Sequence, residues 1–162
     1  MINKNLKSEI KKFWNENSCG EIYAKGNREK AYYETQANSR NKLEPYIKTF
    51  AKFDEGKDKD VLEIGVGMGA DHIEWSKARP KSLTGIDFSS TAIEHSQKRF
   101  SLYGFKSKLI KADAEKLPFD NNSFDLIYSF GVLHHTPNTE KAINEIFRTI
   151  RPGGIARIMI YN

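Results

Sequence analysis

Apolar residues divide the chain into an N-terminal part with helical spacing and a C-terminal part in which short apolar runs alternate with amphipathic stretches. In the first part, a helix over 4–14 is predicted by four apolar residues at helical spacing, Leu6, Ile10, Phe13 and Trp14. A second apolar stretch covers 32–53, and Pro45 within it predicts a helix break just before that residue. The charged stretch 54–60 contains a glycine and predicts a linker.

After the linker, strand-like and helix-like segments follow one another. Short apolar runs predict five strands, over 60–64, 82–86, 107–110, 124–129 and 155–160. Between them, apolar stripes at helical spacing predict three helices, over 70–79, 91–103 and 139–150. The run Thr91-Ala92-Ile93-Glu94 has the spacing of a capping box that opens the second helix, and Gly104 is its expected stop. We expect Pro152-Gly153-Gly154 to end the third helix.

This alternation predicts an α/β fold with a doubly wound, mostly parallel sheet covered on both faces, because right-handed crossovers join parallel strands. We expect an N-terminal helical cap over 1–56 and a sheet domain over 57–162. Ligands of such sheets bind outside the carboxyl ends of the strands, where the strand order reverses. The loops that follow the first four strands should therefore surround one crevice.

Composition narrows the class of protein. The chain of 162 residues fits one ordinary domain, and its apolar and charged fractions are those of a globular protein. The net charge is +5, but the lysines are interleaved with acids, as in 55–60, so a solvated surface is a better interpretation than a nucleic-acid site. A single cysteine, Cys19, a polar N-terminus and the lack of a long apolar run predict a cytoplasmic protein without membrane segments.

Alternate glycines follow the first predicted strand, at Gly65, Gly67 and Gly69. Such a loop turns tightly and lets a ligand approach the backbone, and with Ala70 it also satisfies the dinucleotide pattern of nicotinamide enzymes. Glu63 separates these alternatives, because a carboxylate facing a pyrophosphate would repel it. The same carboxylate suits S-adenosylmethionine, which carries a cationic sulfonium and a cationic ammonium. Glu63 could also simply pin the loop by accepting backbone N–H bonds.

Further polar residues stand at the tips of the next two predicted strands. Asp87 can accept hydrogen bonds from the two hydroxyls of a ribose, and Phe88 beside it can pack on an adenine or belong to the core. Asp113 can accept from an adenine amino group while the Ala114 N–H donates to a ring nitrogen. Alternatively, Asp113 only caps its loop.

Two of these segments carry a resemblance to a known family. The run 61–69 resembles motif I of class I methyltransferases, with Glu63 at the position of the family's acid. The run 113–119 is similar to the D-A-x-x-L-P-F segment of small-molecule methyltransferases that include ubiquinone and menaquinone biosynthesis enzymes. The resemblance implies a Rossmann-like sheet with strand order 3-2-1-4-5. It also implies S-adenosylmethionine as cofactor, S-adenosylhomocysteine as its product and a small molecule as methyl acceptor.

The resemblance also assigns roles near the acceptor. It implies that backbone carbonyls of Ser129 and Phe130 take the ammonium of the methionine portion. His134 and His135 match the family's L-H-H element, and we expect His134 to contact the acceptor and to act as a general base, although it could equally order the loop. Tyr33 is a candidate for the acceptor pocket, with core packing as the alternative. No cysteine and histidine cluster indicates a metal.

The family's sheet has seven strands, whereas this chain ends directly after the fifth. We therefore expect either a fragment of a longer protein or a homodimer formed through the exposed edge of the fifth strand. Two alternatives to an active methyltransferase remain at this point: a non-catalytic domain that binds S-adenosylmethionine, and a nicotinamide-dependent oxidoreductase that uses the same glycines.

Overall fold

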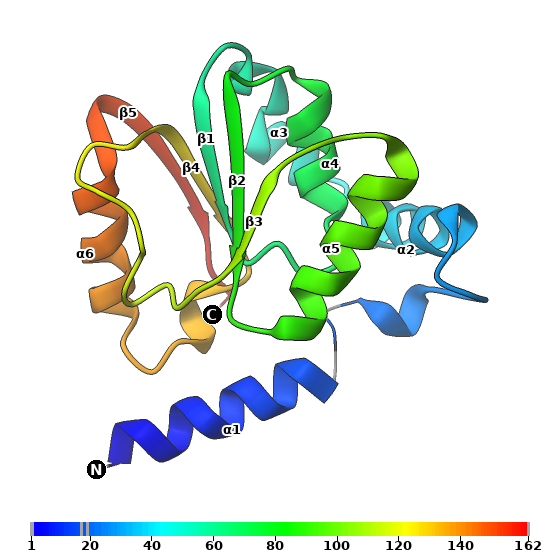
Figure 1. The fold of residues 1–162 in the computed structure, drawn as a ribbon, viewed down its shortest axis with the longest axis horizontal. Coiled ribbons are helices and arrows are strands. Elements are labelled where there is room, and N and C mark those ends of the chain that lie inside the picture. Colours follow the sequence, from blue (N-terminus) through cyan, green and yellow to red (C-terminus); the bar gives the residue numbers. More distant parts are fainter. Residues whose placement is uncertain (1, 17, 19, 162) are drawn as a thin grey trace.

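The structure is a computed structural model that describes residues 2–16, 18 and 20–161; Cys19 lies outside the described residues. A parallel five-stranded sheet forms its centre, in the order β3-β2-β1-β4-β5 (Figure 1). The strands are β1 (Asp60–Ile64), β2 (Ser82–Asp87), β3 (Lys108–Lys111), β4 (Phe124–Phe130) and β5 (Ile150–Met159). Leu62 of β1 pairs with Thr84 of β2 on one side and with Ile127 of β4 on the other. The predicted α/β fold and strand order are confirmed.

Helices cover both faces of the sheet and one of its ends (Figure 1). The α-helices are α1 (Ile2–Glu16), α2 (Lys30–Leu43), α3 (Ile47–Ala51), α4 (Ala70–Lys77), α5 (Ser90–Tyr103) and α6 (Thr139–Thr149). Short 3₁₀ helices are η1 (Glu21–Tyr23), η2 (Phe53–Gly56) and η3 (Leu133–His135). The break expected before Pro45 separates α2 from α3. None of the helices in the described part of the chain has both the length and the apolarity that a membrane-spanning segment needs.

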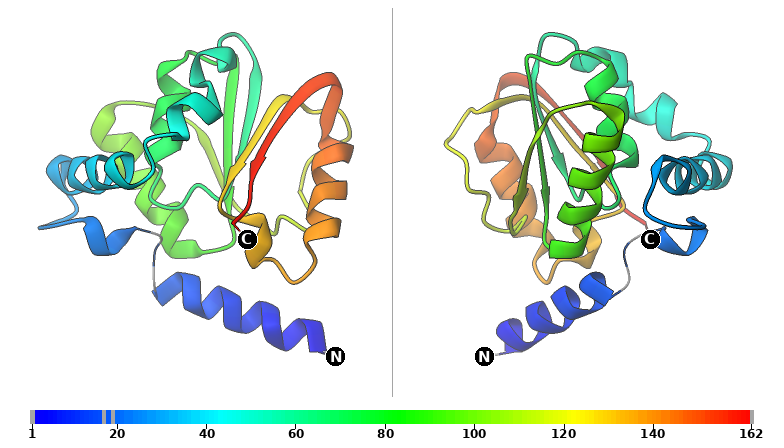
Figure 2. Two further views of the ribbon diagram at one scale, coloured as in Figure 1. Left: turned by 180° about the vertical axis from the view of Figure 1, so that it is seen from behind. Right: turned by 45° about the vertical axis from the view of Figure 1, so that its right-hand side comes forward.

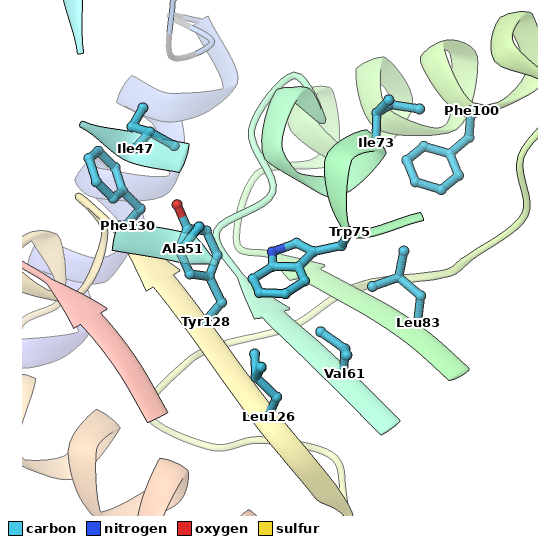
Figure 3. Close-up of a cluster of buried hydrophobic side chains, with 10 residues drawn as sticks. All are labelled: Ile47, Ala51, Val61, Ile73, Trp75, Leu83, Phe100, Leu126, Tyr128 and Phe130. Carbon is cyan, nitrogen blue, oxygen red and sulfur yellow. The ribbon is translucent and has the colours of Figure 1, made fainter. Parts of the chain in front are cut away.

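One face of the sheet packs against α3, α4 and α5 (Figure 3). Its core contains Trp75 of α4 and Tyr128 of β4, whose ring centroids lie 5.4 Å apart. Ile47 and Ala51 of α3 belong to the same buried cluster. The expected boundary between cap and sheet domain stays a prediction, yet α3, which precedes it in sequence, packs on the sheet core.

The opposite face packs against α6 and the chain between β3 and β4. Leu62 and Ile64 of β1 point to this face, and Ile146 of α6 and Leu117 cover them. Side chains alternate between faces along a strand, so Glu63 must point to the first face, toward α4. The alternation of side chains along β1 therefore determines that Glu63 meets a residue of α4.

Three local predictions are corrected by the structure. The cap of α5 is Ser89 rather than Thr91: its hydroxyl accepts from the Ala92 N–H at 3.2 Å, which satisfies an otherwise unpaired helix amide. The fifth strand begins at Ile150, which already pairs with Phe124. The pairing shifts register between Phe124 and Leu126, and the Pro-Gly-Gly residues lie in this irregular part of the strand. The expected linker contains η2 and is not a plain loop.

Helix α1 crosses the carboxyl ends of the strands and contacts α5 (Figure 2). In both views of Figure 2 it runs below the sheet, at the end where the loops after β1, β2 and β4 meet. The N-terminal segment thus forms a lid over the region in which the sequence places its candidate site.

Candidate functional site

A cavity opens between α1 and the carboxyl ends of the strands. The sheet side is formed by residues from the β1, β2 and β4 tips and from the loops after β1 and β3, among them Glu63, Gly65, Gly67, Asp87, Phe88, Asp113, Ala114 and Phe130. The lid side is formed by Lys7, Ile10 and Trp14 of α1. Eight of the predicted site residues therefore share one cavity, at the position where parallel sheets of this kind bind ligands.

The glycine loop after β1 has backbone angles that other residues adopt only with strain. The φ angles of Gly65, Gly67 and Gly69 are 84°, 50° and 75°, all in the left-handed region. At Gly65 a Cβ atom would lie 2.2 Å from a methyl carbon of Val132, in the loop after β4. Glycine is thus required here both by conformation and by the close approach of two loops.

The N–H groups of this loop donate to acceptors within the protein. Gly65 and Val66 both donate to the Ile86 carbonyl, at 2.8 and 3.1 Å, and Gly69 donates to the Val66 carbonyl at 2.8 Å. The Gly67 N–H donates to the carboxylate of Asp87 at 3.0 Å. A pyrophosphate site instead points such amides at the ligand. The loop therefore lacks the donor array expected of a dinucleotide site at these four amides.

Glu63 lies at the tip of β1, lines the cavity and is only 3% exposed. Its Oε2 atom lies 2.8 Å from Nδ1 of His72, a fully buried histidine on α4. Burial raises the pKa of the Glu63 carboxyl well above its ordinary value, and the neighbouring carboxylates of Asp71 and Asp87 raise it further, against the influence of Arg40. The polar partner of Glu63 is therefore His72, whereas the loop N–H groups described above donate to other acceptors.

A second acid, Asp71, completes this wall of the cavity. Arg40 of α2 binds its carboxylate with both terminal nitrogens, and the Tyr128 hydroxyl donates to it at 2.7 Å. Burial lowers the pKa of Arg40, but the Asp71 carboxylate outweighs it and the net shift is upward. The guanidinium also lies 5.3 Å from the ring centroid of Phe130. The positive charge of Arg40 is therefore largely matched by Asp71.

Asp87 joins the loops after β1 and β2. One carboxylate oxygen accepts from the Gly67 N–H at 3.0 Å and the other from the Ser89 N–H at 2.9 Å. Burial raises its pKa, and these backbone bonds only partly oppose that shift. A carboxylate can accept about four hydrogen bonds, so this one keeps acceptor capacity for a ligand. Phe88 lines the cavity directly beside it.

Asp113, in the loop after β3, faces the lid. Its carboxylate lies 2.5 Å from Nζ of Lys7, which also approaches Glu115 at 2.7 Å. Its other oxygen accepts from the Glu115 N–H at 2.9 Å, so the predicted loop-capping role is present. The Ala114 side chain is buried in the cavity wall. Any ligand that uses Asp113 must share this carboxylate with Lys7.

The other end of α1 is fixed near the start of α5. The Asn15 side-chain oxygen accepts from the Ser90 N–H and from the Ser89 hydroxyl, both at 3.0 Å. Trp14, one residue earlier, lines the cavity and has its ring centroid 5.1 Å from that of His135 in η3. The lid is thus attached at two places, by an ion pair at Lys7 near its middle and by hydrogen bonds at Asn15 near its C-terminal end.

Four predicted site residues do not line the cavity. Gly69 caps α4, Ser129 is fully buried in β4, and Tyr33 is buried with its hydroxyl 3.3 Å from Nδ1 of His95. His134 contacts His135 and Tyr161, with ring centroids 3.9 and 5.6 Å away, while His135 itself lines the cavity. The geometry therefore moves the candidate base from His134 to its neighbour, and it favours core packing for Tyr33.

Sequence reasoning missed two contacts that shape the cavity. One feature of the sequence could have indicated His72: it is a polar residue on the buried face of the helix that follows the glycines. Lys7 carried none, because it is one of many lysines in the chain. Among the described residues, no group of three or more histidine, cysteine, aspartate or glutamate side chains is arranged to hold a metal ion.

Comparison with known proteins identifies the family. The family described as "Methyltransferase domain" matches residues 62–158, from β1 to the end of β5. The chain belongs to this family. The matched segment carries the glycine loop and all the acids named above, whereas α1 and α2 lie outside it.

Two curated relatives match part of this chain. The chain is 37% identical over 97 residues to a phthiotriol/phenolphthiotriol dimycocerosates methyltransferase of Mycobacterium leprae, over 59% of this chain and 35% of that protein. It is 33% identical over 123 residues to a sterol 24-C-methyltransferase of Pneumocystis carinii, over 75% of this chain and 32% of that protein. The chain thus spans about a third of the length of these relatives.

A solved structure covers the N-terminal helices as well. Phosphoethanolamine N-methyltransferase 1 of Haemonchus contortus, in complex with phosphoethanolamine and S-adenosylhomocysteine, aligns with a TM-score of 0.72. The alignment covers 99% of this chain and 33% of that one, at 18% sequence identity. At this identity the likeness supports the fold only.

Proposed function

We propose that this chain is the cofactor-binding domain of an S-adenosylmethionine-dependent methyltransferase that acts on a small-molecule acceptor and releases S-adenosylhomocysteine. The observation that carries the proposal is the number of acidic side chains that line the cavity. Four acids line it, Glu63, Asp71, Asp87 and Asp113, against two cationic side chains that are already paired with Asp71 and Asp113. Such a cavity favours a ligand with cationic groups.

The residues present fit this cofactor. Glu63 faces the part of the cavity next to the glycine loop, where it would hold the cationic methionine end with help from the Phe130 carbonyl. Asp87 has acceptor positions for the ribose hydroxyls, and Asp113 with Ala114 would take the adenine edge. Phe88, which lines the cavity, would cover the adenine face. When bound, S-adenosylmethionine supplies an activated methyl group.

The protein's own contribution is positioning and exclusion of water. The strand tips fix one wall of the cavity, and α1 covers the other, so that acceptor and methyl group are held in line. Burial lowers the pKa of His135, and the neighbouring His134 lowers it further, so its imidazole is neutral near pH 7. A neutral imidazole at the cavity wall can take a proton from an acceptor that must lose one.

We further propose that the acceptor is apolar over much of its length. Ile10 and Trp14 on the lid and Phe130 on the opposite wall present apolar surface to the cavity. The names of the two curated relatives, which describe methyltransferases of phthiotriol dimycocerosates and of sterols, agree with such an acceptor. A chromatographic product assay with radiolabelled S-adenosylmethionine and lipid, sterol and quinone-precursor panels tests this point.

The two alternatives predict different binding. A nicotinamide oxidoreductase needs free loop amides for the pyrophosphate, and the amides of 65, 66, 67 and 69 already donate within the protein. A non-catalytic domain would bind S-adenosylhomocysteine but methylate nothing on the acceptor panel. The chain spans about a third of the length of its curated relatives. That this chain alone transfers a methyl group is therefore part of the proposal.

Calorimetric titration with S-adenosylmethionine, S-adenosylhomocysteine and NAD tests the proposal. We expect the first two to bind and NAD not to bind. Asp87→Ala should weaken S-adenosylhomocysteine at least about tenfold, the value of about one lost charge-assisted hydrogen bond. Binding of NAD alone, or an unchanged affinity of Asp87→Ala, would contradict the assignment.

The location and assembly of the protein are also proposals. A single cysteine in the chain supports the reducing cytoplasm. β5 is an edge strand of the sheet, and homodimer formation through that edge stays a prediction, which light scattering at high protein concentration tests.

A further inference from the structure

Behind Glu63 lies a buried row of polar groups that the proposed function does not use. Glu63 Oε2 lies 2.8 Å from His72 Nδ1, and His72 Nε2 lies 2.7 Å from the Ser107 hydroxyl. The Ser107 hydroxyl in turn donates to the Leu83 carbonyl at 2.9 Å. The row therefore runs from the cavity wall on β1, through α4, to the backbone of β2.

The hydrogen bonds fix the number of protons in this row. Ser107 has one hydroxyl proton, which goes to the Leu83 carbonyl, so its oxygen must accept from an N–H at His72 Nε2. One further proton then lies between His72 Nδ1 and Glu63. It sits either on the carboxyl, giving a neutral pair, or on the imidazole, giving an ion pair.

Packing holds the imidazole in this position. His72 is fully buried, and its ring centroid lies 4.9 Å from that of Phe100. Gly85 on β2 makes room for it, since a Cβ atom there would lie 2.7 Å from His72 Cε1 and 2.8 Å from Nε2, and also 2.5 Å from Val66 Cγ1. The glycine in the middle of β2 is thus explained by the two side chains that pack over it, those of His72 and Val66.

The charges around the pair favour the neutral form in the protein alone. Burial raises the pKa of Glu63, and Asp71 on α4 and Asp87 on β2 raise it further, while Arg40 on α2 opposes them. Burial lowers the pKa of His72 to about 3. Tyr128 on β4 keeps its proton, because burial and then Asp71 raise its pKa. A cation beside Glu63 changes this balance, because it stabilises the carboxylate directly.

We propose that His72 is a positioning residue that accepts the Glu63 proton when a cationic ligand enters the cavity, so that a carboxylate faces the cation without any proton leaving the protein. The bond from Oε2 to its hydrogen breaks, the bond from Nδ1 to the same hydrogen forms, and no other proton moves. The inference rests on the proposed function, since S-adenosylmethionine is the expected cation.

Counting the protons released on binding tests the inference. S-adenosylmethionine is titrated by calorimetry in two buffers of different ionisation enthalpy, and the neutral analogue 5′-methylthioadenosine serves as comparison. We expect the wild type to release about no protons with either ligand. His72→Asn keeps a polar partner for Glu63 but no base, so it should release about one proton with S-adenosylmethionine only. Its affinity for that ligand should then rise with pH, by at most about tenfold per pH unit, until the pH passes the pKa of Glu63.

Control variants separate the outcomes. His95→Asn replaces another fully buried histidine, whose ring nitrogens face Tyr33 and Glu21 rather than Glu63, and should behave like the wild type. Glu63→Gln, which cannot ionise, should release no proton and should lose the preference for the charged ligand. Thermal unfolding of each variant confirms that it is folded.

The results distinguish this inference from the proposed function. If the wild type binds neither ligand, the proposed function fails. If the wild type binds S-adenosylmethionine but His72→Asn releases no proton, the inference fails, whether or not affinity falls, because His72 then acts only by packing. Release of one proton by the wild type also overturns it.

Discussion

The two walls of the cavity are built in different ways. The strand-tip wall, comprising the tips of β1, β2 and β4 with their loops, is held by the buried Glu63, by the half-buried Asp87 and by Gly65 with its positive φ. The lid, α1, is held by contacts between partly exposed groups, the Lys7 ion pair and the Asn15 hydrogen bonds. Buried polar groups are costly to leave unpaired, whereas exposed ion pairs contribute little. The strand-tip wall should therefore be coupled to global stability, and the lid should open without unfolding the sheet.

The largest expected effect contrasts two glycines with positive φ. Gly65→Ala should lower the free energy of unfolding by about 2 to 5 kcal/mol, because backbone strain adds to the clash with Val132. Gly26, between η1 and α2, has a φ of 90°, but a Cβ atom added there would have no neighbour within 4 Å. Gly26→Ala should therefore cost only about 1 to 2 kcal/mol of backbone strain. Urea unfolding measures both, and equal losses would remove the contrast.

The second effect is a dependence on pH. Folding raises the pKa of Glu63 above its ordinary value of 4.5, so the folded chain keeps a proton that the unfolded chain releases. Stability from this group is present below pH 4.5 and is lost as the pH rises toward the folded pKa, at no more than about 1.4 kcal/mol per pH unit. Glu63→Gln should lose this slope when unfolding is measured between pH 5 and 8. An unchanged slope would mean that Glu63 is already ionised in the folded protein.

A smaller, local effect is expected at the lid. Asn15→Ala removes the acceptor for the Ser90 N–H and the Ser89 hydroxyl, at a cost of about 1 kcal/mol. Amide hydrogen exchange should become faster in 6–16, while the amides of β1 keep their protection. Glu9→Ala, on an exposed position of the same helix, is the control. Faster exchange across the sheet would show that the lid and the strand-tip wall unfold together.

The smallest effect is expected at Lys7. Burial lowers the pKa of this lysine, but the Asp113 and Glu115 carboxylates outweigh it and raise it overall, so the pair is fully formed below pH 10.5 and weakens as the pH rises through the folded pKa. Its partial exposure and screening by solvent limit its contribution, so Lys7→Met should change the free energy of unfolding by less than about 1 kcal/mol at pH 7. Lys12→Met, an exposed lysine of the same helix, is the control in the same urea titration. If Lys7→Met lowered the free energy of unfolding by more than about 2 kcal/mol, Lys7 would be coupled to global stability as the strand-tip wall is.

Much of the fold followed from local patterns. Apolar runs and helical stripes located the strands and α4 to α6, because burial on a sheet or a helix imposes a short period on the sequence. The boundary of β5 was wrong, since Pro152-Gly153-Gly154 forms a bulge within the strand, after pairing has begun at Ile150. The pattern in the residues does not distinguish a turn before a strand from a turn inside it.

The candidate site, like the fold, was predictable only in part. The sequence located the acids at the strand tips, because parallel strands carry their loops to one edge of the sheet. It chose His134 as the general base, whereas its neighbour in the same 3₁₀ turn, His135, is the one that lines the cavity. In an irregular loop, no period predicts which of two adjacent side chains faces the cavity.

The sequence by itself determined the strand–helix order, the glycine loop and the acids that line one crevice, since all of these depend on residues close together in the chain. Only the tertiary structure decided the partners of those acids. Lys7 meets Asp113 across 106 residues, and Ser107 meets His72 across 35. Such pairs form where separate elements pack, and packing brings together side chains whose spacing in the sequence carries no period.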